Sequence, residues 1–168
     1  MASILPVSTS YVGRQLDLEA LQSVQQPSIT YVEVAPSVTF DTPKIVAGAQ
    51  KLVQRYAILF TTIAGSDMSD PDFGTSLYSV FETGSVTGSG DLYLYAEAAN
   101  RMTKRRIISE DDDESTYGNQ PDDEKLDDCW IDRVDVDKDT RRISVFARIR
   151  TKAGADVTFV VPTKSGIY

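Results

Sequence analysis

The sequence predicts an α+β fold, with an N-terminal arm and helices packed on a C-terminal three-stranded antiparallel meander. Two observations predict it. Segments in the first two thirds of the chain repeat apolar residues at helical spacing, whereas apolar and polar residues alternate in the last third. A length of 168 residues suits one domain that buries a sizeable core. We expect an arm over residues 1–28 and a single domain over residues 29–168.

The first long helix is expected over residues 41–65. Thr42 can cap it, Pro43 stands at the first helical position, and Gly65 is placed to end it. One apolar stripe follows the helical period: Ile45, Ala49, Leu52, Val53, Tyr56, Phe60 and Ile63. A short helix is expected within residues 75–82, and a second long helix over residues 92–109 with Asp91 as its cap.

The last third predicts three strands. Ile143, Val145, Ala147 and Ile149 alternate with polar or aromatic residues, and the pattern returns at residues 157–161. Residues 130–136 form the third expected strand, and TKAG at residues 151–154 suits a hairpin turn. Near the N-terminus, residues 28–40 predict an extended segment broken at Pro36, and residues 13–24 predict a short helix within the arm.

Charge is concentrated in one place. The net charge is −8, but residues 109–128 hold ten acids and one lysine, which leaves 15 acids and 16 bases elsewhere. This balance argues against a nucleic-acid partner. The segment has almost nothing to bury, so we expect a solvated acidic loop that meets a basic neighbour, with Asp111, Asp112 and Asp113 contributing.

Composition also limits the chemistry. Histidine is absent and Cys129 is the single cysteine, which excludes an internal disulfide and a Ser or Cys triad of the usual kind. No apolar run approaches the length of a membrane span, and the N-terminus lacks the features of a secretion signal. We therefore expect no membrane partner, no cofactor and no catalytic residue.

Two segments resemble ion sites only in part. Asp135, Asp137 and Asp139 begin like a calcium loop, but the required glycine and glutamate positions hold Thr140 and Phe146. We expect a hairpin turn there and no metal. The glycine-rich residues 83–91 lack the lysine of a phosphate loop. The basic run at residues 104–106 either meets a phosphate or acidic partner, or complements a helix dipole.

The stretch SDMSDPDFGTSL, residues 66–77, packs three acids, a proline and a glycine between two apolar runs. Its acids could hold a metal, act in acid–base chemistry, or form a polar turn. With the preceding helix, the stretch resembles the central signature of the phage baseplate-wedge family, also called sheath initiators, baseplate assembly protein W or the lysozyme-like baseplate protein. The matching positions are Thr62, Gly65, Asp67, Met68, Pro71, Phe73, Gly74, Leu77, Val80 and Phe81.

The resemblance covers roughly residues 40–162 and favours the turn interpretation. We expect Met68, Phe73 and Leu77 to tuck the turn onto the core, with Pro71 and Gly74 setting its backbone. The chain departs from the family where a Glu-Pro-Arg motif, associated with docking on the wedge's helical core bundle, usually precedes the first meander strand. EKLDDCWIDR stands there instead, so the candidate wedge contacts are Asp127, Asp128, Trp130 and Arg133.

The resemblance implies a mechanical role in the baseplate of a contractile tail, assembled in the host cytoplasm. Its implied partners are the tail sheath protein, baseplate wedge proteins, and tube or hub proteins, with several copies in a six-fold baseplate. The expected means is β-strand addition to sheath subunit arms, at an edge in residues 129–162 that carries Val157, Phe159 and Val161. The alternatives are an adaptor or secretion-system baseplate subunit of the same fold, and a peptidoglycan hydrolase.

Overall fold

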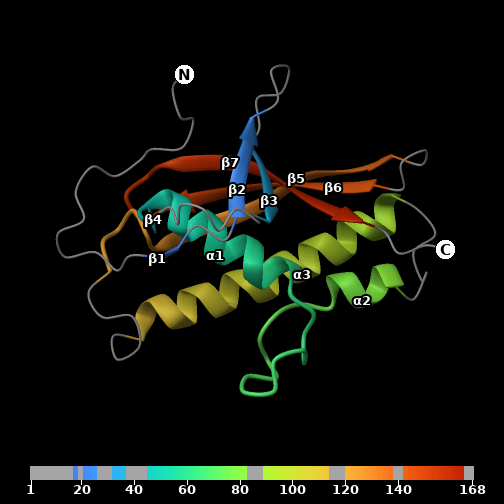
Figure 1. Cartoon of the computed structure of the whole chain (residues 1–168), viewed down its shortest axis with the longest axis horizontal. Coiled ribbons are helices and arrows are strands. Elements are labelled where there is room, and N and C mark those ends of the chain that lie inside the picture. The colour runs from blue at the N-terminus through green and yellow to red at the C-terminus, as the bar shows by residue number, and fades with distance from the viewer. Residues whose placement is uncertain are drawn as a thin grey trace.

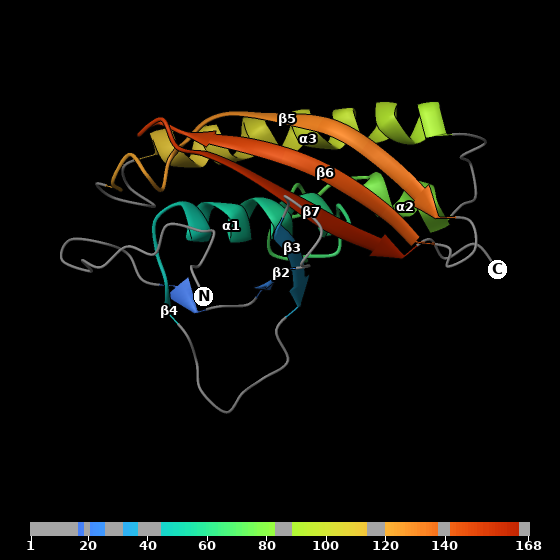
Figure 2. The ribbon, with the colours of Figure 1, turned by 90° about the horizontal axis from the view of Figure 1, so that it is seen from above.

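The α+β prediction is confirmed in a computed structural model, which describes residues 17–18, 21–25, 32–36, 45–82, 89–113, 120–137 and 142–164. The C-terminal meander consists of β5 (Leu126–Asp137), β6 (Arg142–Thr151) and β7 (Asp156–Lys164), each antiparallel to the next (Figure 2). The predicted hairpin turn at residues 151–154 is present, and residues 138–141 of the other predicted turn lie outside the described residues, although the strands on either side of them pair. Asp137 pairs with Arg142, and Gly154 donates its backbone N–H to the Thr151 carbonyl at 2.8 Å.

Three helices lie along this sheet: α1 (Ala49–Thr61), α2 (Leu77–Glu82) and α3 (Ser89–Asp112) (Figure 1). The core joins their apolar stripes to the alternating residues of the strands. Tyr56 of α1 packs edge-on against Phe159 of β7, with ring centroids 5.4 Å apart. Val145, Ala147 and Ile149 of β6 are fully buried in the same cluster. The alternation in the sequence therefore does mark one core face.

The first long helix is shorter than expected. Thr42 and Pro43 lie outside the described residues, and Ile45 belongs to the short strand β4 (Ile45–Val46). The helix begins only after Gly48, whose φ of 63° is left-handed and whose N–H donates to the Glu124 carboxylate at 3.1 Å. It ends at Thr61, before Gly65, because Thr62 turns to extended backbone.

The N-terminal segment contributes strands, so the helix predicted at residues 13–24 is wrong. β1 (Asp17–Leu18) pairs with β4, while β2 (Leu21–Gln25) and β3 (Val32–Pro36) form an antiparallel pair. β3 then runs parallel to β7, which gives a five-stranded sheet in the order β2-β3-β7-β6-β5. A short segment gains little from local helix formation, so pairing with a neighbouring strand decides its conformation.

The acidic segment is not one solvated loop. Helix α3 continues to Asp112 and β5 already begins at Leu126. Two of the acids are buried: Asp111 is 5% exposed and Glu124 is 2% exposed. Buried carboxylates need partners, and these acids find them on α1. Asp111 accepts from Arg55 at 2.6 Å, and Glu124 accepts from the Lys51 ammonium at 3.1 Å.

None of the helices in the described part of the chain is long and apolar enough to cross a membrane.

Candidate functional site

Residues 62–76, here called the signature turn, are closed at the base by main-chain hydrogen bonds. Thr75 donates its N–H to the Thr62 carbonyl at 2.8 Å, and Ala64 donates to the Thr75 carbonyl at 2.9 Å. The buried Thr75 hydroxyl donates to the Phe60 carbonyl at 2.8 Å and so ties the turn to the last turn of α1. The long connection is thereby held at its base as one fixed loop.

Gly74 and the apolar residues beside it behave as the sequence predicts. Gly74 has a φ of 98°, and a Cβ atom there would lie 2.5 Å from the Thr62 carbonyl oxygen. Only glycine fits this backbone and this approach. Phe73 packs against the core and Leu77 is 1% exposed. Gly65 has a φ of 81° but open space around it.

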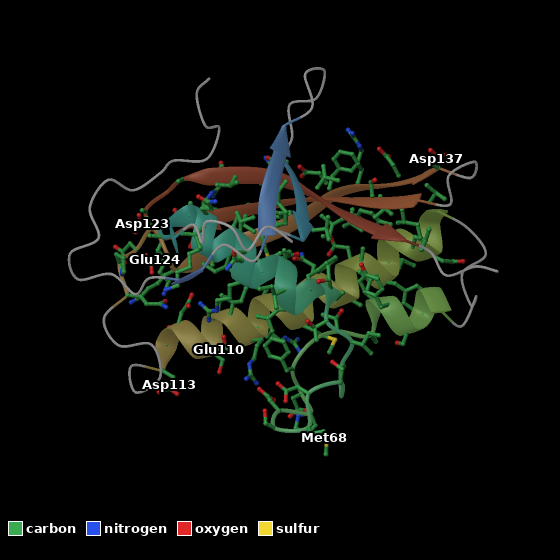
Figure 3. The ribbon with its side chains drawn as sticks, in the orientation of Figure 1. Met68, Glu110, Asp113, Asp123, Glu124 and Asp137 are labelled. Atoms are coloured by element: carbon green, nitrogen blue, oxygen red, sulfur yellow. The ribbon has the colours of Figure 1, made fainter. Side chains whose placement is uncertain are left out.

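The prediction that Met68 packs onto the core is wrong, because its side chain is 97% exposed at the tip of the turn (Figure 3). The turn interpretation of the acids holds for Asp67, which accepts from the Ser69 N–H at 2.8 Å and hydroxyl at 2.6 Å. These hydrogen bonds, the hydroxyl first, hold the pKa of Asp67 below its usual value.

The other residues in and after the turn include a further acid, Asp70, and three signature positions. Asp70 pairs with Arg106 of α3 and anchors the far part of the turn. Pro71 is exposed, and Val80 is half-buried in α2. Phe81 lies in α2, but its side chain is outside the described part of the structure. No group of acids among the described residues is arranged to hold a metal ion.

Two β-bulges in β5 arrange the candidate wedge contacts. Register shifts occur between Leu126 and Asp128 and between Ile131 and Arg133, so Asp127 and Asp132 are the extra residues. The pairing partners on β6 show that Asp128, Trp130 and Arg133 share the sheet face opposite the helices, here called the outer face. Three of the four predicted contacts are therefore brought together, and Asp127 stands beside them at the bulge.

Arginines of β6 and β5 cover the aromatic rings of the outer face. The guanidinium carbons of Arg148 and Arg150 lie 5.3 and 5.0 Å from the centre of the Trp130 ring. Arg133 lies over Phe146 at 3.8 Å. Such cation–π contacts hold flat charged groups against the sheet.

The predicted contacts did not include Arg148, Arg150 and Phe146, although the alternation along β6 indicates that these residues lie on the outer face. Residues that alternate with a core face must lie on the other face. The ion pairs of Arg148 with Asp132 and of Arg150 with Asp156 complete this face, at 3.0 and 2.9 Å.

Asp128 is engaged within the protein. It accepts from Lys104 of α3 at 2.5 Å and from the Cys129 N–H at 2.8 Å. The Lys104 hydrogen bond is the main cause that lowers the pKa of Asp128. To contact a wedge protein, the Asp128 carboxylate would have to break its ion pair with Lys104.

The predicted sheath-binding edge lies on β7, and the side chains at its three predicted positions face the core. Val157, Phe159 and Val161 are buried in the core, so their side chains are unavailable to a partner. β3 also pairs with β7 at two positions, Val32 with Phe159 and Glu33 with Val160. Among the described residues, no strand other than β3 pairs with that side of β7, which continues to Lys164.

The opposite edge of the sheet, along β5, is closed in its first half by side chains. Tyr93 and Asn100 of α3 donate to the carbonyls of Ile131 and Cys129, at 3.2 and 3.3 Å. Asp111 accepts from the Leu126 N–H at 2.9 Å. Together with the two bulges and the exposed aspartates, these bonds make β5 a poor acceptor of an added strand.

No protein-family model matches this chain, and comparison with curated proteins found no match.

Proposed function

We propose that this protein is a structural subunit of a contractile-tail baseplate that initiates the sheath by β-strand addition. The observation that carries the proposal is the parallel pairing of β3 with β7. It adds a segment from outside the meander to the meander's edge through main-chain hydrogen bonds, at two residue pairs among the described residues. An edge that accepts a strand from outside the meander is suited to accept an arm from a neighbour.

The order of elements supports the same role. A helix, a pinned turn with Gly74 at its close approach, a short helix, a long helix and a meander follow one another as the family resemblance implies. The closed edge at β5 leaves the β7 side as the direction in which the sheet can extend. The role needs no catalytic group, and we propose a structural component rather than a peptidoglycan hydrolase.

The test is a reversible lock on the β3–β7 pair. Glu33→Cys with Val160→Cys places two thiols at partner positions, where an oxidised bond would hold β3 in place. We expect the oxidised protein to fail to start sheath on reconstituted tube and wedge proteins of its tail. Adding a reductant should restore sheath growth, because the arm can then replace β3.

The matched control joins Asp135→Cys with Ser144→Cys, a registered pair between β5 and β6 on the outer face. It adds the same chemistry away from the proposed edge, so sheath should form in both redox states. Electron microscopy counts the sheathed tubes. Equal sheath formation by the locked and reduced Glu33→Cys/Val160→Cys protein would contradict strand addition at this edge.

A further inference from the structure

The side of α3 that points away from the sheet is an unpartnered helix surface. Leu94, Ala98, Arg101 and Arg105 recur at helical spacing and are all exposed, Leu94 at 68%. We call these four residues the α3 ridge. Its first half is apolar and its second half is basic, and Tyr95 and Met102 extend the apolar part with exposures of 37% and 44%.

The two arginines of the α3 ridge have no carboxylate partner among the described residues. Their neighbours differ: Lys104 pairs with Asp128, and Arg106 pairs with Asp70 and Glu110. Among the described residues, Arg101 and Arg105 are thus two exposed cations one helical turn apart without an ion pair. Two such cations suit a partner that carries acidic residues.

The ridge is also bordered by two adjoining hollows that share Arg101. One is lined by Tyr93, Leu94, Glu97, Ala98 and Arg101, and the other by Arg101, Lys104, Arg105, Ile108 and Ser109. A row of hollows beside a ridge is the surface into which the side chains of a second helix pack. The length of α3, from Ser89 to Asp112, gives such a helix several turns of contact.

We propose that the α3 ridge binds an acidic amphipathic helix of a partner protein. Apolar side chains of that helix pack on Leu94 and Ala98, and two carboxylates one turn apart pair with Arg101 and Arg105. This surface lies on the helix layer rather than at the β7 edge. The inference therefore stands independently of the sheath role.

The test uses a synthetic helical peptide of about 18 residues, or five turns, with leucines along one face and glutamates beside them. Binding to the full chain is followed by fluorescence anisotropy. Arg101→Glu with Arg105→Glu should weaken binding roughly tenfold, a loss of about 1.4 kcal/mol, since both ion pairs become repulsive. Leu94→Ser should weaken binding as well, without the salt dependence of the charge variant.

Lys125→Glu combined with Lys152→Glu is the matched control, because it reverses two exposed or half-buried lysines away from the ridge. A peptide with lysines in place of the glutamates should not bind. The proposal is overturned if the ridge variants bind the acidic peptide as well as the control does, or if the basic peptide binds equally. It is also overturned if light scattering shows that the ridge is covered by a second copy of the chain.

Discussion

Gly74 shows how one residue fixes the signature turn. Its left-handed φ alone disfavours a side chain, and its Cα lies so close to the Thr62 carbonyl that a Cβ would stand 2.5 Å from the oxygen. Gly65 in the same turn shares the left-handed backbone, with a φ of 81°, but has nothing within 4 Å. Comparing the two glycines separates the free-energy cost of the left-handed dihedral angle from that of the close approach to a carbonyl.

We expect Gly74→Ala to lower the free energy of unfolding by more than Gly65→Ala. The dihedral cost of about 1–2 kcal/mol is common to both, and only Gly74→Ala adds a backbone clash. Urea denaturation of the two variants measures the difference. Equal losses would mean that the turn relaxes away from Thr62 at no cost.

Cys129 and Asn100 form the polar junction of the core. Asn100 accepts from the Tyr56 hydroxyl at 2.7 Å and from the Cys129 thiol at 3.0 Å, and it donates to the Cys129 carbonyl. Burial raises the pKa of the Cys129 thiol to about 12, and burial raises the pKa of Tyr56 as well. Both groups therefore stay protonated in the folded protein when the unfolded chain has begun to ionise.

This shift predicts a loss of stability in alkali. A pKa raised from 9.0 in the unfolded chain to about 12 stabilises the fold fully below pH 9, and that stability is lost as the pH rises toward 12. Unfolding free energies should fall less steeply over this range in Cys129→Ala, which lacks the titrating thiol. If the difference in unfolding free energy between the two proteins stays constant from about pH 8 to about pH 11, the Cys129 thiol is not the cause of the loss.

At the scale of elements, ion pairs join the end of α3 to α1, and a hydrogen bond joins it to β5. Arg55 of α1 bonds Asp111 at 2.6 Å and Glu110 at 2.8 Å, while Asp111 also accepts from the Leu126 N–H. Glu124 makes a second buried link, to Lys51 and to the Gly48 N–H at the start of α1. The acids of residues 109–128 thus fix how α1, α3 and β5 lie relative to one another.

Asp111→Asn should lower the free energy of unfolding by about 2 kcal/mol, because the Arg55 guanidinium loses the more deeply buried of its two counter-charges and keeps only Glu110. Asp112→Asn is the control. Its carboxylate is exposed and lies 3.9 Å from Lys152, so we expect a change within about 0.5 kcal/mol. Urea denaturation compares the two. A change at Asp111 as small as that at Asp112 would show that Glu110 alone compensates the charge of Arg55.

At the scale of the whole molecule, the two outer strands of the meander differ. α3 closes the first half of β5 with side-chain hydrogen bonds, whereas β7 receives a parallel strand over two residue pairs. The helices occupy one face of the meander, and arginines stacked on Trp130 and Phe146 occupy the other. The proposed strand addition would therefore be confined to the β7 side, and the proposed helical partner would bind elsewhere, on the α3 ridge.

The sequence by itself determined the α+β class, the alternating core face of β6 and β7, and the glycine of the signature turn, because periodicity and left-handed backbone are local properties. Tertiary structure decided the rest. Pairing placed β3 beside β7, burial drew Asp111 and Glu124 inward, and the turn left Met68 outside. These outcomes depend on contacts between residues far apart in the chain, which no local pattern encodes.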